Sequence, residues 1–186
     1  MLIAGGRLIV GGDTESTCYF KDIYLNEAND RVKEVREQLL PDMPIATYGS
    51  FTIVCHNRVV RGGGQDENDK CVGDVIEFDD VAGWKPLPSL KARRSFAGAC
   101  VLKNTLIVGG GVDSDYRILD TIEMLYITEF ENSAQWTISK SKLPTSKLQA
   151  PTLSELQGKI ILIDGNFSGT PNLMGHGNAS NYFVAC

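Results

Sequence analysis

Short apolar runs, each closed by glycine or Asp-Gly, recur along the chain. They are Leu8–Val10 before Gly11-Gly12, Val59–Arg61 before Gly62-Gly63-Gly64, Leu106–Val108 before Gly109-Gly110-Gly111, and an imperfect copy, Ile160–Ile163 before Asp164-Gly165. The second glycine of each cluster stands at 12, 63, 110 and 165, so the copies are 51, 47 and 55 residues apart. A period of about fifty residues indicates a repeat protein in which each unit is one small β-sheet.

Alternating and β-branched runs between turn residues predict the strands of each unit. For units one and two the ranges are Met1–Ala4, Arg7–Val10, Tyr19–Leu25 and Val32–Gln38, then Phe51–Cys55, Arg58–Arg61, Val72–Phe78 and Trp84–Lys85. For units three and four they are Phe96–Leu102, Thr105–Val108, Leu119–Ile127 and Gln135–Ser139, then Thr152–Leu156, Lys159–Ile163 and Tyr182–Ala185. Asn57 and Lys103-Asn104 fall in hairpin turns. Helical character is confined to residues 27–40, which lack a strong apolar stripe.

The copies agree in more than their glycines. Unit two continues with Asp74–Phe78, Trp84 and Leu87-Pro88, and unit three repeats this as Asp120–Met124, Trp136 and Leu143-Pro144. About six extra residues, near 126–132, are expected to form a loop in unit three. Unit one has Tyr24 and Leu40-Pro41 but no tryptophan, and unit four reaches only a third strand.

These elements, in register, resemble the kelch repeat family, whose unit has a glycine pair ending the second strand, an aromatic residue in the third and a tryptophan in the fourth. The resemblance spans nearly the whole chain. It implies an all-β, kelch-type β-propeller of about four blades, each of four antiparallel strands. We expect one domain, residues 1–186, with units at about 1–48, 49–95, 96–149 and 150–186, the last unit being incomplete.

Kelch propellers usually have five to seven blades, so closure of the ring is open at this point. The chain is a fragment of a longer protein, an unusual four-bladed ring, or half of a ring that two copies complete by self-association. One route to closure is that Tyr182–Val184 pairs beside the first unit.

Glycines and tryptophans of the repeat are expected to be structural. Glycine lets backbones approach closely where strands converge, and a buried indole fills the wedge between blades. The structural set is Gly11, Gly12, Gly63, Gly64, Trp84, Gly109, Gly110 and Trp136. We expect Trp84→Ala to cost about 3–5 kcal/mol.

Loops after the second and fourth strands of each blade emerge on one face, because the strands alternate in direction. Loops after second strands are acidic, with Asp13, Glu15, Asp66, Glu67, Asp69, Asp113 and Asp115. Loops after fourth strands are basic, and the basic residues of the face are Lys91, Arg93, Arg94, Arg117, Lys140, Lys142 and Lys147. Such a surface suits a protein or peptide ligand that carries both signs. We expect glutamate at both Arg93 and Arg94 to weaken partner capture and to leave folding nearly unchanged.

Composition narrows the class of partner. The 186 residues are 42% hydrophobic and 22% charged, with a formal net charge of −5. Overall acidity argues against nucleic acid, and no apolar run is long enough to span a membrane. Five scattered cysteines and the lack of a basic leader predict a reduced, cytoplasmic protein. The sequons at Asn166 and Asn178 point weakly the other way.

Catalytic chemistry is scarce in this sequence. His56 and His176 are the only histidines, the cysteines lack metal-ligand spacing, and the triglycine of unit two lacks the lysine of a phosphate-binding loop. Some kelch-like propellers are copper oxidases similar to galactose oxidase, but their ligands do not match positions here. We therefore expect neither enzymatic activity nor a cofactor.

The favoured hypothesis is a non-catalytic interaction module, with an enzyme of the galactose-oxidase-like propeller type as an alternative. In many kelch relatives the propeller follows a BTB domain and selects substrates for cullin-based ubiquitin ligases, and in others it binds actin. The resemblance implies either partner class without choosing between them.

Overall fold

The computed structural model describes residues 2–7, 14–25, 32–39, 41–56, 58–79, 81–127, 134–143, 150–163 and 181–184, with side chains from residue 41 to 163 within these ranges. Every element in this part of the chain is a β-strand. The strands are β1 Leu2–Arg7, β2 Thr14–Leu25, β3 Val32–Leu39, β4 Phe51–Cys55, β5 Arg58–Gly62, β6 Val75–Asp79, β7 Gly83–Leu87, β8 Gly98–Leu102, β9 Thr105–Gly109, β10 Thr121–Tyr126, β11 Thr137–Lys142, β12 Thr152–Leu156, β13 Lys159–Ile163 and β14 Asn181–Val184.

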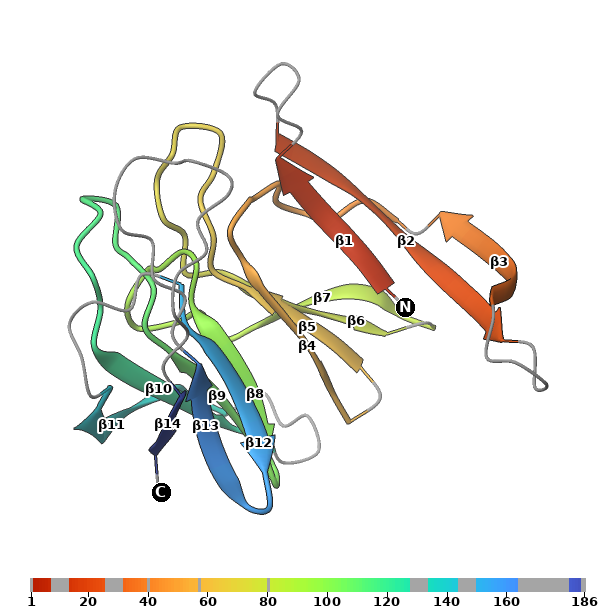
Figure 1. The fold of residues 1–186 in the computed structure, drawn as a ribbon. Coiled ribbons are helices and arrows are strands. Elements are labelled where there is room, and N and C mark those ends of the chain that lie inside the picture. The colour runs from red at the N-terminus through yellow and green to blue at the C-terminus, as the bar shows by residue number, and fades with distance from the viewer. Residues whose placement is uncertain are drawn as a thin grey trace.

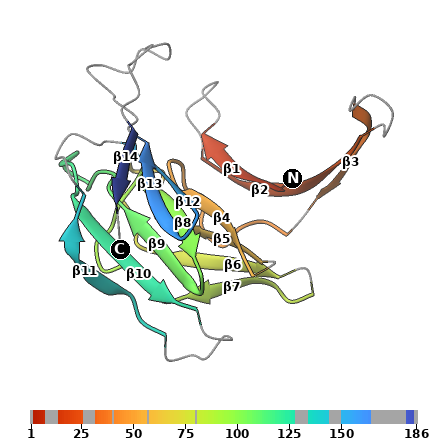
Figure 2. The same cartoon turned by 60° about the horizontal axis from the view of Figure 1, so that its bottom comes forward.

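The strands form four antiparallel sheets in chain order. Two sheets have four strands, β4-β5-β6-β7 and β8-β9-β10-β11, and two have three, β1-β2-β3 and β12-β13-β14. The inner strands β4, β8 and β12 lie next to one another, so three of the sheets fan out from a shared edge, whereas β1–β3 stands to one side in both views (Figure 1, Figure 2). This arrangement confirms the expected all-β architecture, a partial kelch-type propeller.

Apolar residues that face both sides of a sheet hold the neighbouring sheets together. One core joins the second and third sheets through Phe51, Val60, Leu106, Leu125 and Trp136, all buried. Another joins the third and fourth sheets and includes Ile107, Leu153 and Leu162. Because β9 contributes Leu106 and Val108 to the first core and Ile107 to the second, its central residues are all apolar rather than alternating.

The hairpin turns of this part of the chain use residues with positive φ. Gln157 and Gly158 have φ of 53° and 75°, as a two-residue turn between right-twisted strands requires. His56 and Lys103, at the β4–β5 and β8–β9 turns, have φ of 48° and 54°. The predicted turn at 103–104 is confirmed, whereas Asn57 lies outside the described residues.

Two glycines of the repeat show why a side chain is excluded there. Gly64 has φ of 99°, and a Cβ on it would lie 2.7 Å from the carbonyl oxygen of Tyr48. Gly110 has φ of 70°, and its Cβ would lie 2.6 Å from Pro151. Gly63 likewise has positive φ and faces the Arg94 carbonyl, while Gly109 has ordinary van der Waals room. Gly11 and Gly12 lie outside the described residues.

Both tryptophans reach back to the preceding unit. Trp136 is 1% exposed, and its Nε1 donates to the carbonyl of Pro88 at 2.7 Å. Trp84 is partly buried, and its Nε1 donates to the carbonyl of Pro41 at 2.9 Å while its ring packs edge-to-face on Phe78. The prolines of two Leu-Pro pairs therefore supply matching acceptors, including the pair in unit one.

Trp84→Ala is consequently expected to cost less than the sequence alone predicts. Because part of the indole remains in contact with solvent, we expect a loss of roughly 2 kcal/mol in the free energy of unfolding. Urea denaturation followed by circular dichroism measures it. A loss above that of Trp136→Ala would contradict this placement of the two side chains.

The third strands of units two and three correspond with a shift of one residue from the match that their sequences suggest. The amide of Gly63 donates to the carbonyl of Asp74, whereas the equivalent amide of Gly110 donates to Thr121 rather than to Asp120. The alignment of Asp74 with Asp120, and of Glu77 with Glu123, is therefore wrong. Glu123 occupies the position of Ile76, so the two glutamates face opposite sides of their sheets.

The first unit departs from its predicted strands. β1 extends through Arg7, and the rest of the predicted strand at 7–10 lies outside the described residues. β2 begins at Thr14 and pairs Glu15 with Gly6, so Glu15 lies in a strand and not in a loop. At the other end of the chain, Tyr182–Val184 pairs with β13, so the hypothesis that it pairs beside the first unit is wrong.

Candidate functional site

Loops after β5 and β9 emerge at the same end of their sheets. The β5–β6 loop (63–74) and the β9–β10 loop (110–120) rise at the upper side of Figure 1, opposite the β4–β5 hairpin. Isolated bridges join them to the segments that precede β4 and β8, Tyr48 with Gln65 and Ser95 with Val112. We call the surface formed by these two loops and by residues 47–50 and 91–97 the loop face.

The two loops have the same internal construction. Asp66 accepts hydrogen bonds from the amides of Asn68 and Lys70, at 2.9 and 3.0 Å. Asp113 accepts from the amides of Asp115 and Arg117, both at 2.9 Å. The first carboxylate of each loop therefore shapes the turn, as Asp commonly does in such positions.

Other charged side chains of the loops extend into solvent. Glu67, Asp69 and Asp115 are exposed. Arg117 pairs with Asp115 at 2.9 Å and lies 3.8 Å from Asp113. Such an exposed ion pair contributes little to stability, so these groups are free to exchange partners with a ligand.

Aromatic side chains accompany the charges. Phe96 is 40% exposed and Tyr116 is 61% exposed. Tyr48 packs edge-to-face on Phe96 with ring centroids 6.3 Å apart, and its hydroxyl donates to Asp69. The segment before β4 and the β5–β6 loop are thereby joined by side chains as well as by backbone.

Neighbouring loops are also tied to each other. The amide of Cys71 donates to Ser114 Oγ at 3.0 Å, and its thiol lies 3.4 Å from both Ser95 Oγ and the Val112 carbonyl. Cys71 is fully buried. The loop face is therefore a connected surface across the junction of the second and third sheets.

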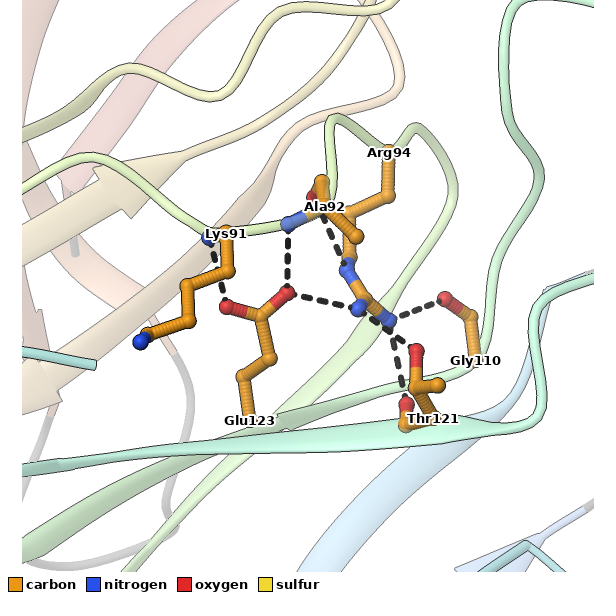
Figure 3. Close-up of polar contacts among 6 residues, drawn as sticks. All are labelled: Lys91, Ala92, Arg94, Gly110, Thr121 and Glu123. Carbon is orange, nitrogen blue, oxygen red and sulfur yellow. Dashed lines mark hydrogen bonds and ion pairs between the residues drawn. The ribbon is translucent and has the colours of Figure 1, made fainter. Parts of the chain in front are cut away.

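Arg94 is the main correction to the predicted surface. Its side chain is 0% exposed and so is that of Glu123, with Arg94 Nη2 and Glu123 Oε1 2.7 Å apart (Figure 3). Arg94 also donates to the carbonyls of Gly110 and Thr121, at 2.9 and 3.1 Å, and to Thr121 Oγ1 at 2.9 Å. The guanidinium of Arg94 donates its hydrogen bonds to groups inside the fold, so Arg94 cannot contact a partner.

Glu123 is equally well satisfied. Besides Arg94, it accepts hydrogen bonds from the amides of Lys91 and Ala92, at 2.7 and 2.9 Å. Burial lowers the pKa of Arg94 from its ordinary value, while the charge of Glu123 and their shared hydrogen bond act in the opposite direction. The pair fixes the connection between β7 and β8 against the third sheet.

The other predicted basic residues are distributed differently from expectation. Arg93 is exposed on the loop face. Lys140 and Lys142 lie on the outer strand β11 and not in a loop, and Lys142 Nζ pairs with Asp120 at 2.8 Å. Both therefore lie in a strand and not in the predicted loop, and Lys142 is engaged with the last residue of the β9–β10 loop. Lys147 and Asp13 lie outside the described residues.

Sequence reasoning missed Tyr48, Phe96, Tyr116 and Glu123. The signal for Glu123 is a charge inside the apolar strand Ile122–Leu125, which calls for a buried partner. The signal for Tyr116 is an aromatic residue among the charged residues of a loop. No sequence signal distinguishes Tyr48 and Phe96, because each lies shortly before a strand and resembles a core residue.

A second buried carboxylate, that of Glu77, lies between the second and third sheets. Glu77 Oε1 accepts a hydrogen bond from Arg58 at 2.9 Å. The pKa of Cys55 is raised by burial first and by the charge of Glu77 second.

Among the described residues no three histidine, cysteine or acidic side chains gather as a metal site. The same residues contain no helix of the length and hydropathy needed to cross a bilayer.

Curated proteins resemble this chain over part of its length. Kelch-like protein 41b of Danio rerio is 29% identical over 102 residues, which cover 51% of this chain and 17% of the relative. Kelch repeat protein M-T9 of Myxoma virus (strain Lausanne) is 30% identical over 96 residues, covering 50% and 17%. Kelch-like protein 40 of Xenopus tropicalis is 28% identical over 137 residues, covering 72% and 20%. The chain therefore spans about a fifth or less of the length of these relatives.

A solved structure shares the fold. The structure of YjhT superposes with a TM-score of 0.64 at 12% identity, over 87% of this chain and 54% of the other. No protein-family model matches the sequence. Taken with the glycine and tryptophan repeat and the sheets that share an inner edge, these similarities support the resemblance of the chain to the kelch-repeat family.

Proposed function

We propose that this chain is a non-catalytic protein-recognition module that binds a partner protein or peptide through the loop face. The observation that carries this proposal is the exposure of Phe96 and Tyr116 among charged side chains, on loops positioned by a rigid β scaffold. Large exposed side chains that cluster on loops are characteristic of recognition surfaces.

The internal order of the loops supports the same function. Each loop is closed by its own aspartate, and the two loops are connected through Cys71 and Ser114. A surface that is already ordered loses little conformational entropy when it binds, which favours affinity.

The finer role that we propose is substrate recognition for a cullin-based ubiquitin ligase, in the cytoplasm. Its support is the resemblance to kelch-like proteins. Actin is the alternative partner class, and the experiment below separates the two.

Affinity capture from cytosol tests the proposal. We expect the wild-type chain to retain a specific partner, and Tyr116→Ala, which removes an exposed aromatic side chain, to retain less of it at unchanged melting temperature. Recovery of a cullin supports the ligase role, and co-sedimentation with actin filaments supports the alternative. Identical capture by wild type and by a variant in which Arg93, Glu67 and Tyr116 are all alanine would overturn the use of the loop face.

We propose no catalytic role and no cofactor. His56 is exposed in the β4–β5 hairpin, at the end of the sheet opposite the loop face, and His176 lies outside the described residues. Stoichiometric copper in the purified protein would overturn this part of the proposal.

A further inference from the structure

This inference rests on the proposed function and names the class of partner. We infer that the loop face binds a positively charged peptide segment, which contacts the aromatic pair Tyr48 and Phe96 and is held by carboxylates of the β5–β6 and β9–β10 loops.

Tyr48 and Phe96, which we call the aromatic pair, form a partly exposed contact between two units. The rings of Tyr48 and Phe96 meet at 65°, and the amide of Phe96 donates to the Gly49 carbonyl at 2.6 Å. A Cβ on Gly49 would lie 2.8 Å from the Phe96 ring, so the glycine leaves the space that the ring occupies. Phe96 is nevertheless 40% exposed, although phenylalanine is among the residue types that are most often buried.

The backbone at Phe96 supports a role for its ring. The bridges of Tyr48 with Gln65 and of Ser95 with Val112 are equivalent, so Phe96 occupies the position of Gly49 in the preceding unit. Gly49 has φ of 65° and Phe96 has φ of 55°. An aromatic residue in this left-handed region is strained where glycine is not. The strain is retained for a ring that remains partly exposed, as expected of a binding residue.

The charge around the aromatic pair favours a cationic ligand. The β5–β6 and β9–β10 loops carry two cations, Lys70 and Arg117, and Arg117 is paired with carboxylates of its own loop. Against these stand seven carboxylates, Asp66, Glu67, Asp69, Asp74, Asp113, Asp115 and Asp120. Asp69 lies beside the aromatic pair, because the hydroxyl of Tyr48 donates a hydrogen bond to its carboxylate.

The basic residues that were expected to balance these carboxylates are largely elsewhere. Arg94 is neutralised by Glu123 in the interior, Lys140 lies on β11, and Lys142, at the end of β11, is already paired with Asp120. Lys91 and Arg93 remain exposed, and Arg93 Cγ would lie 3.6 Å from a Cβ on Gly73, the residue before the exposed Asp74. A lysine or arginine of a partner would find aromatic faces and carboxylates together, which is a favourable site for a cation.

Selection from a displayed library of random twelve-residue peptides on the immobilised chain tests the partner class. We expect the bound peptides to be enriched in lysine and arginine and to bind less tightly as salt is raised. Phe96→Gly should weaken the selected peptides by about tenfold or more, as loss of an aromatic anchor does. Its melting temperature should stay within about 5 °C of wild type, because relief of strain offsets the lost ring contacts.

Two matched controls separate binding from general effects. His56→Gly relieves a positive φ of 48° in the β4–β5 hairpin, far from the loop face, and should leave peptide affinity unchanged. Glu67→Lys should weaken the basic peptides by about tenfold, whereas Glu155→Lys, the same charge change on β12, should weaken them less than twofold. Equal losses in the two lysine variants would show attraction to net charge only and would overturn the site.

The outcomes distinguish this inference from the proposed function. If no peptide binds saturably and no partner is captured, the proposed function fails. If peptides bind and compete with the captured partner but are acidic or uncharged, or if Phe96→Gly binds them as tightly as wild type does, only this inference fails.

Discussion

Arg94→Ala is expected to lower the free energy of unfolding by about 3–5 kcal/mol, because it leaves the carboxylate of Glu123 buried without its countercharge. The guanidinium also satisfies the carbonyls of Gly110 and Thr121, which would lose a donor together. Against a typical total stability of about 5–15 kcal/mol, such a loss would be conspicuous in urea denaturation.

Arg93→Ala is the matched control for this prediction. The two arginines are adjacent in sequence, but Arg93 is exposed, so its loss should change stability by less than about 0.5 kcal/mol. Arg94→Glu should lower the free energy of unfolding further than Arg94→Ala does, since two carboxylates would then face each other in the interior. Equal stabilities of Arg93→Ala and Arg94→Ala would refute the buried pair. The expectation that both arginines tolerate charge reversal is therefore corrected for Arg94 alone.

Trp136→Ala is expected to cost about 3–5 kcal/mol as well, for a different reason. The indole is 1% exposed in the core between the second and third sheets, so truncation opens a large cavity there. The hydrogen bond to the Pro88 carbonyl is lost at the same time.

Trp136→Phe separates the two contributions. It keeps most of the apolar volume and removes the indole N–H, so we expect a smaller loss, with about 1 kcal/mol due to the hydrogen bond. Thermal and urea unfolding of both variants provide the measurement. If the alanine variant were no less stable than the phenylalanine variant, packing by Trp136 would not matter to the fold.

Much of the fold follows from the sequence because its information is local. Strands β4, β12 and β13 coincide with the predicted ranges, since short apolar or alternating runs and the turns that flank them define these strands without reference to the rest of the chain. The division of the chain into units remains a prediction.

The features that sequence reasoning missed depend on contacts between distant residues. Arg94 stands in a loop among exposed charges, and its partner Glu123 is 29 residues further on, so nothing near Arg94 reveals its burial. The one-residue offset between units two and three is hidden because both copies contain an Asp and an Ile-Glu pair, and only backbone hydrogen bonds show which positions correspond. The exposed ring of Phe96 depends in the same way on Gly49, in the preceding unit.

The tryptophan–proline hydrogen bonds give the chain a direction of dependence. Each indole donates to a carbonyl that is 43 or 48 residues closer to the amino terminus. During translation the acceptor therefore emerges from the ribosome before its donor, and each blade can dock onto a predecessor that already exists. Assembly that proceeds vectorially in this way would limit the time for which any newly made sheet waits with its indole unsatisfied.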